Sequence, residues 1–180
     1  MSRSNPYKLK PQKAKLTILA FGEGQTEKAF LKYLGSVYIL RESGISIDYD
    51  YAGGKDPEYM ISRVIRKKKA GDYSKIFILM DSDKEVLDKT KTKAGKNKIL
   101  IIYSNPCVEG LFLDILEKKS NSTSKNSQLC KKEFESKYLN ENDKMDEKKY
   151  EKFFNIDKLE LARKKVKTID DLVKILKNES

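Results

Sequence analysis

The 180-residue chain contains no histidine, no tryptophan and only two cysteines. Without imidazole it cannot build a Ser-His-Asp or Cys-His catalytic system, and without further cysteines it cannot build a zinc finger. Any chemistry must therefore use carboxylates, lysines and bound metal. We interpret Cys107 and Cys130 as packing residues, because free cysteine is usually buried.

Long apolar runs are also missing from the sequence. No run approaches the roughly 20 residues that a membrane-spanning helix needs. The first fifteen residues are basic and polar with no apolar segment behind them, so we expect no signal peptide. We therefore expect a cytoplasmic protein without a membrane partner. The length suits one α/β domain with a small helical appendage.

Positive charge is in excess: 38 Lys and Arg oppose 27 Asp and Glu, a net charge of +11. Residues 1–104 hold 21 of the cations and only 12 of the anions. The cations cluster at 3–15, 63–69 and 84–98. Such a surplus favours a polyanionic partner, with nucleic acid first among candidates. The alternative is a lysine-rich protein whose charge serves solubility alone.

The central motif is Ile-Phe-Ile-Leu-Met-Asp-Ser-Asp-Lys at 76–84. Five consecutive apolar residues predict a strand that is buried on both faces, as in parallel sheets covered by helices. Asp81 and Asp83 follow it, and in an extended chain residues two apart point to the same side, roughly 6.5 to 7 Å apart. Two neighbouring carboxylates need a cation between them. The motif thus predicts a divalent-metal site. Lys84 is a candidate catalytic residue that would stabilise a phosphate or leaving group; the alternative is a solvent-facing lysine in a lysine-rich chain.

Strands and helices alternate along the rest of the first two thirds of the chain. A strand at 15–21 is followed by a glycine turn and a helix that starts near Thr26. An alternating, half-exposed strand at 45–51 is expected at the sheet edge. The remaining predicted elements are a helix at 57–70, a short helix or loop at 85–96, a strand at 98–103, and a helix with Asn105 as N-cap and Pro106 in the first helical position. Four helical segments follow after residue 127.

This alternation predicts parallel strands joined by right-handed crossovers. Parallel strands end at one edge of the sheet, where such folds bind ligands. Glu23, Asp81, Asp83 and Glu109 all follow strands and should meet there. An acidic pocket in a basic protein suits Mg²⁺ acting on a nucleic-acid backbone. Each acid also has a simpler interpretation: a solvated loop residue, a turn cap, or, for Glu27 and Glu109, a first-turn acid that complements a helix dipole.

Two motifs resemble the Toprim family. Ala20-Phe21-Gly22-Glu23-Gly24 looks like its hydrophobic-Glu-Gly motif, and Leu79-Met80-Asp81-Ser82-Asp83 looks like its later Asp-x-Asp. More narrowly, Glu23-Gly24-Gln25-Thr26-Glu27 together with Ser104-Asn105-Pro106-Cys107-Val108-Glu109 resembles RloB-like proteins. These are found beside bacterial restriction and abortive-infection loci and are related to the Toprim part of OLD-type nucleases. The resemblance covers residues 15–117.

The resemblance implies a Toprim/Rossmann-like α/β fold with a mainly parallel four-stranded sheet flanked by helices. The expected organisation is a flexible basic arm at 1–14, the Toprim-like domain at 15–117, and a helical C-terminal extension at 118–180. Carried over from the family, Glu23, Asp81 and Asp83 would bind Mg²⁺ or Mn²⁺. Glu27 and Glu109 would be further ligands or neighbouring acids.

The functional expectation is a metal-dependent nuclease of DNA or RNA, with a role in bacterial phage defence implied by the resemblance. One alternative is a non-catalytic nucleic-acid-binding subunit that acts with a partner. Another is a nucleotide-sugar transferase that holds metal through its Asp-x-Asp, although this leaves Glu23 unexplained. The sequence leaves open the choice of DNA or RNA, the number of metals, and assembly into a homo-oligomer.

Overall fold

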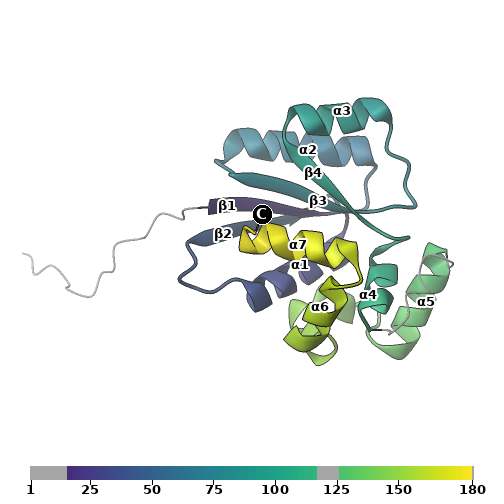
Figure 1. Cartoon of the computed structure of the whole chain (residues 1–180). Coiled ribbons are helices and arrows are strands. Elements are labelled where there is room, and N and C mark those ends of the chain that lie inside the picture. Colours follow the sequence, from purple (N-terminus) through teal and green to yellow (C-terminus); the bar gives the residue numbers. More distant parts are fainter. Residues whose placement is uncertain (1–15, 117–125, 180) are drawn as a thin grey trace, which may run out of the picture.

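The computed structural model describes residues 16–116 and 126–179 (Figure 1). The arm expected at residues 1–14 lies outside them. Four strands form one sheet in the order β2-β1-β3-β4, and all neighbouring strands are parallel. They are β1 (Leu16–Gly22), β2 (Ile45–Tyr51), β3 (Lys75–Asp81) and β4 (Ile99–Ser104). The predicted α/β class with a parallel four-stranded sheet is confirmed.

Helices connect and cover these strands. They are α1 (Gln25–Tyr38), α2 (Pro57–Ala70), α3 (Asp88–Lys96), α4 (Val108–Leu116), α5 (Ser127–Lys137), α6 (Ile156–Arg163) and α7 (Lys167–Lys177), with short 3-10 turns η2 (Asp143–Met145) and η3 (Glu147–Lys152). Helix α2 has the predicted limits because Asp56 caps it, accepting a hydrogen bond from the Tyr59 amide, and Pro57 fits its first turn. No helix in the described part of the chain is long and apolar enough to cross a membrane.

The start of α4 differs from the prediction. Asn105 and Pro106 do not begin the helix, which starts at Val108. Their polar groups instead bind the turn after β3, since the Asn105 side chain accepts from Ser82 Oγ and the Pro106 carbonyl accepts from the Asp83 amide. The cap comes from a distant residue: the Val108 amide donates to Asp81 Oδ1 at 2.9 Å. The end of β3 therefore fixes where α4 begins.

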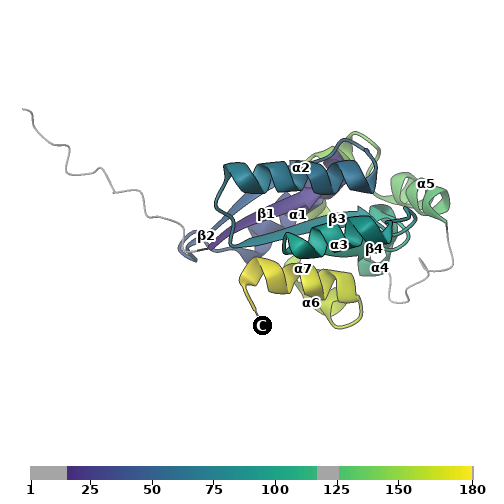
Figure 2. The same ribbon diagram turned by 90° about the horizontal axis from the view of Figure 1, so that it is seen from above.

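The elements form three layers (Figures 1 and 2). Helices α2 and α3 cover one face of the sheet, and α1, α4 and α7 lie on the other. Each face has its own hydrophobic core. The larger core joins α1 and α4 to the C-terminal segments through an aromatic cluster made of Phe30, Phe112, Phe134, Tyr150 and Phe154. The C-terminal helices thus pack into the same core as the sheet.

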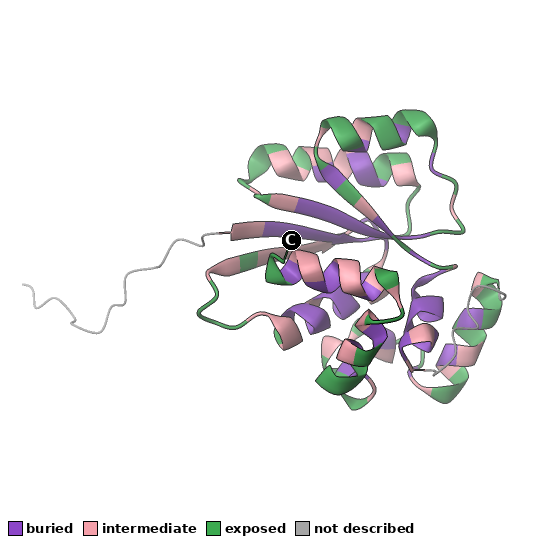
Figure 3. Cartoon of the chain, viewed as in Figure 1, coloured by how far each residue is buried: buried purple, intermediate pink, exposed green. Residues whose placement is uncertain are grey.

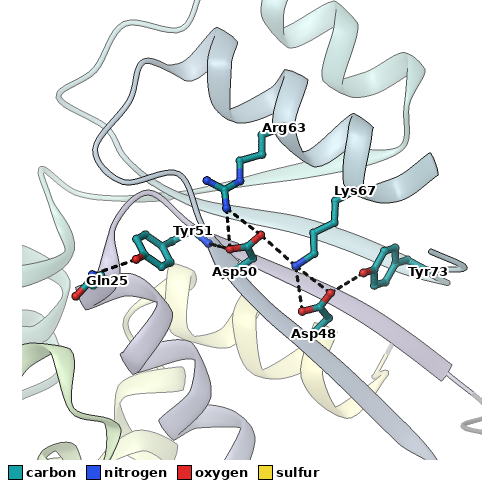
Figure 4. A network of polar contacts seen from close by, with 7 residues as sticks. All are labelled: Gln25, Asp48, Asp50, Tyr51, Arg63, Lys67 and Tyr73. Atoms are coloured by element: carbon teal, nitrogen blue, oxygen red, sulfur yellow. Dashed lines mark hydrogen bonds and ion pairs between the residues drawn. The ribbon is translucent and has the colours of Figure 1, made fainter. Parts of the chain in front are cut away.

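Strand position explains the burial pattern (Figure 3). The central strands β1 and β3 are buried on both faces, with Ile18–Phe21 fully inaccessible. Strand β2 lies at an edge, as predicted, and its side chains alternate. Asp48 and Asp50 face α2, where Arg63 and Lys67 bind them, whereas Tyr51 turns the other way toward Gln25 (Figure 4).

Candidate functional site

The order in which strands are added to the sheet changes side between β1 and β3. From β1 it continues to β2 on one side, and from β3 to β4 on the other. The crevice at such a switch point is where open α/β sheets bind ligands. A cavity of about 410 Å³ opens there. Six acids line it: Glu23, Glu27, Asp81, Glu109, Glu135 and Glu141.

Glu23 and Asp81 are in contact at the ends of the two central strands. The Asp81 amide donates to Glu23 Oε2 at 3.3 Å, and the residues are only 7% and 6% exposed. Gly22 allows the tight turn before Glu23, because a Cβ there would lie 2.8 Å from the Glu27 Cβ. The acids that follow β1 and β3 therefore meet, as the parallel topology predicts, and their role as metal ligands stays a prediction.

One oxygen of Asp81 is already engaged by the fold. Oδ1 accepts from Ser104 Oγ at 2.8 Å and from the Val108 amide at 2.9 Å. Burial raises the pKa of Asp81 to about 7, and the negative charges of Glu23 and Glu109 add to the increase against the opposing bond from Ser104. The carboxyl group is thus held in position beside two further negative charges.

Glu27 stands at the first turn of α1 and is 6% exposed. Its Oε2 accepts from the Gly24 amide at 2.7 Å, which closes a capping box at the helix start. Burial raises the pKa of Glu27 to about 8, with a further contribution from the charge of Asp81. The first-turn role suggested by the sequence is therefore real, and the same side chain also lines the cavity.

Glu109 is paired with a lysine that the sequence did not single out. Lys144, in η2, lies 2.5 Å from Glu109 Oε1 and 2.7 Å from Glu135 Oε1. Burial lowers the pKa of Lys144, but its bonds to Glu109 and Glu135 outweigh this effect and raise it above its ordinary value. The second oxygen, Glu109 Oε2, is buried and has no hydrogen-bond partner among the described residues. A buried, unpartnered carboxylate oxygen is an acceptor that lacks a donor or cation.

Asp83 and Lys84 lie apart from the cavity lining. Asp83 is exposed, and its carboxylate accepts from Ser127 Oγ. The expected placement of Asp83 beside Asp81 in one pocket is therefore not observed, because β3 ends at Asp81 and the chain turns there. Lys84 bends back so that its Nζ lies 2.5 Å from Glu23 Oε1. The assignment of Asp83 as a metal ligand stays a prediction.

The C-terminal segments supply part of the cavity wall, which sequence reasoning missed. No catalytic group was expected in them, yet Lys131, Glu135, Glu141 and Lys144 all line the cavity. Lysine and glutamate are abundant throughout this region, so no pattern distinguishes these four. Only the packing of α5 and η2 against the sheet brings them to the site.

The donor set suits a hard divalent cation, which prefers carboxylate oxygens. Two observations support this fit: Glu109 Oε2 has no hydrogen-bond partner among the described residues, and burial, with repulsion between the neighbouring acids, raises the pKa values of Asp81 and Glu27. Within the described ranges, no three His, Cys, Asp or Glu side chains are already arranged as a ligand group. The ammonium groups of Lys84 and Lys144 lie beside Glu23 and Glu109 instead.

Comparison with known proteins gives one match. No curated protein and no solved structure matches the chain significantly. The family described as RloB-like protein matches residues 18–178, which include β1 from its third residue onward, the other three strands, every acid described above and the C-terminal helices. The chain therefore belongs to the RloB-like protein family.

Proposed function

We propose that this protein is a Mg²⁺- or Mn²⁺-dependent nuclease. The observation that carries the proposal is the cluster of buried acids at the switch point of the sheet, formed by Glu23, Glu27, Asp81 and Glu109 in a chain of net charge +11. Buried acids at a ligand-binding edge are costly without a cation. Their retention in a cationic protein supports a metal that acts on a polyanion.

Glu23, Asp81 and Glu109 would hold the metal, with Glu27 beside them. A bound Mg²⁺ would supply a nucleophilic water at neutral pH and stabilise the charge that develops on a scissile phosphate. Asp81 can present Oδ2 to the cavity while Oδ1 stays fixed by Ser104 and Val108. The end of β3 and the start of α4 therefore fix the position and orientation of the Asp81 carboxylate that would bind the metal.

The lysines around the cavity have a matching role. The Lys84 ammonium lies beside the cavity, 2.5 Å from Glu23 Oε1, and Lys131 lies exposed on the cavity wall. Ammonium groups at these positions would draw a phosphate toward the acids and neutralise its charge. The binding of nucleic acid and the cleavage chemistry thus use different residues of one cavity.

The resemblance of the motifs to known families also supports a proposal about the type of active site and the biological role. The motifs around Glu23 and Asp81 resemble those of Toprim enzymes, so we infer a Toprim-type active site. The same resemblance supports a role in bacterial phage defence. The nucleotide-sugar transferase alternative leaves unexplained why Glu23 lies buried against Asp81.

A second candidate is a nucleic-acid-binding subunit without catalytic activity. It is favoured by Lys84 and Lys144, whose ammonium groups already compensate Glu23 and Glu109 in the way a metal otherwise would. In this case the acids would organise a basic cavity rather than a reaction centre.

Cleavage assays with isosteric variants separate the two candidates. Supercoiled plasmid and single-stranded RNA would be incubated with the protein and Mg²⁺ or Mn²⁺. We expect Glu23→Gln and Asp81→Asn to abolish cleavage, and the exposed control Glu58→Gln to retain it, since the side chain of Glu58 is 53% exposed and pairs with the exposed Lys89. Equal activity in all four proteins would mean that the nuclease is a contaminant, and would remove the proposal.

A further inference from the structure

A second hollow adjoins the acidic cavity. It has a volume of about 260 Å³ and shares three lining residues with the first: Gln25, Tyr51 and Met145. Its other walls come from α1 and η3 and include Lys28 and Lys32. The two hollows therefore lie side by side at the start of α1, so that one extended ligand could contact both.

The chemistry of the second hollow is opposite to that of the first. Its polar groups are two lysines, a glutamine and a tyrosine, with Glu147 as the single acid. Lys28 has no carboxylate partner among the described residues, and its ammonium lies 5.1 Å from the centre of the Tyr51 ring. Lys32 pairs with Glu147 at 3.4 Å through partly exposed side chains. The hollow thus presents positive charge next to an aromatic ring.

The ring of Tyr51 is held in a fixed direction. Its hydroxyl accepts a hydrogen bond from Gln25 Nε2 at 3.0 Å, and Figure 4 shows the side chain pointing away from Asp50 toward the start of α1. The ring lines both hollows. An aromatic ring fixed beside a lysine is the combination on which single-stranded nucleic acids stack their bases and place their phosphates.

Two cations of the basic cluster on α2 are already paired with acids. Arg63 and Lys67 are bound by Asp48 and Asp50 at 3.0 to 3.2 Å on the opposite face of β2 (Figure 4). Lys68 donates to the Asn97 carbonyl at 2.6 Å. Lys28, in contrast, lies against the Tyr51 ring and can contact a ligand in the second hollow.

We propose that the substrate is a single-stranded nucleic acid, and that the second hollow seats a nucleotide next to the scissile phosphate. Tyr51 stacks on its base, and Lys28 binds its phosphate. This inference rests on the proposed nuclease function and specifies its substrate class. Lys32, one helical turn beyond Lys28 on α1, continues the phosphate path.

Burial of the acids favours a single strand over a duplex. Glu23, Asp81 and Glu109 are 7%, 6% and 2% exposed, and α5 and η2 form the wall opposite the sheet edge. The backbone of a duplex lies on the outside of a wide cylinder. We therefore expect a duplex to be too wide to bring its phosphates to the buried acids of the cavity. Its bases are also stacked on one another, so Tyr51 could reach one only after the strands separate.

Binding measured without metal tests the substrate class independently of catalysis. Fluorescence anisotropy in EDTA would compare single-stranded and duplex oligonucleotides, as DNA and as RNA of the same sequence. We expect the single strand to bind at least tenfold more tightly than the duplex. Tyr51→Leu should weaken single-strand binding about 5- to 160-fold, the range that follows from the loss of one base stack, while Tyr51→Phe should stay within twofold of the original protein.

The role of Lys28 in phosphate binding is tested with two variants that each remove one lysine charge. Lys28→Ala should reduce the slope of log K against log salt by about 0.7, the value for one phosphate contact on a single strand. Lys67→Ala removes the same charge but should leave the slope unchanged, because Asp48 and Asp50 hold that ammonium. Circular dichroism would verify that each variant is folded.

Three results would overturn the inference: duplex binding as tight as single-strand binding, Tyr51→Leu binding like Tyr51→Phe, or equal salt slopes for the two lysine variants. These outcomes are separable from failure of the nuclease proposal. If Asp81→Asn and the original protein bind the single strand equally and neither cleaves it, the binding hollow stands and the nuclease proposal fails.

Discussion

The buried ion pair between Lys144 and Glu109 allows a quantitative prediction about stability. Replacing Lys144 by Met removes the only ammonium within contact distance of Glu109 among the described residues, while the side chains involved are 5% and 3% exposed. Breaking a buried pair from one side costs about 3 to 5 kcal/mol, since the remaining charge is stranded. Glu135 is 36% exposed and can be solvated instead, so it adds little.

Protonation limits the cost and makes it depend on pH. A stranded carboxylate can take up a proton, and for a glutamate with the reference pKa of about 4.3 this costs about 3.7 kcal/mol at pH 7 and about 1 kcal/mol at pH 5. We therefore expect Lys144→Met to lower the free energy of unfolding by about 3 to 4 kcal/mol at pH 7 and by about 1 kcal/mol at pH 5. The total free energy of unfolding of a native protein is about 5 to 15 kcal/mol.

Urea unfolding followed by circular dichroism at both pH values measures this difference. The double variant Glu109→Gln/Lys144→Met should recover most of the loss at pH 7, because no charge is stranded. Lys89→Met breaks an exposed pair with Glu58 and should cost less than about 1 kcal/mol at either pH. A loss for Lys144→Met below about 1 kcal/mol at pH 7, or one that is equal at both pH values, would refute the reasoning.

Three other predictions concern the acidic cavity and the packing of α1. The pKa values of Asp81 and Glu27 are raised to about 7 and about 8, so above pH 4 the folded protein holds more protons than the unfolded chain. The stability of the metal-free protein should therefore fall as the pH rises from 4 to 8, and a urea midpoint that does not change with pH would contradict this. Asp81→Asn keeps an acceptor for Val108 and removes the unfavourable charge, so it should raise the unfolding midpoint at pH 8 and abolish stabilisation by Mn²⁺; a lower midpoint would show that the charge is needed for folding. In Gly35→Ala the new Cβ would overlap the Tyr49 hydroxyl, so we expect the free energy of unfolding to fall by about 1 to 3 kcal/mol. Adding Tyr49→Phe should restore most of this loss, and failure to do so would show that the strain does not come from the Tyr49 hydroxyl.

The sheet was predictable because its signal is local. Buried runs such as 76–80 and the alternation at 45–51 define strands by composition, and the intervening helices require parallel connections. Parallel topology in turn brings Glu23 and Asp81 together without any knowledge of side-chain contacts. The α/β class and the core of the candidate site could therefore be obtained from the sequence.

The rest depends on contacts between distant segments. The start of α4 was misplaced because its cap is Asp81, which the local sequence around Asn105 cannot reveal. The position of Asp83 was inferred from a strand that in fact ends two residues earlier. Lys144 has no local signal at all, since it is one lysine among many and becomes distinctive only when η2 packs beside Glu109.

A crystal structure of the protein with Mn²⁺, phased on its anomalous signal, tests the central claim most directly. We predict an anomalous peak in the cavity within about 2.3 Å of oxygens from both Glu23 and Asp81, with the Lys84 ammonium displaced from Glu23. A cavity with no peak at saturating Mn²⁺, and with Lys84 still bound to Glu23, would contradict the account.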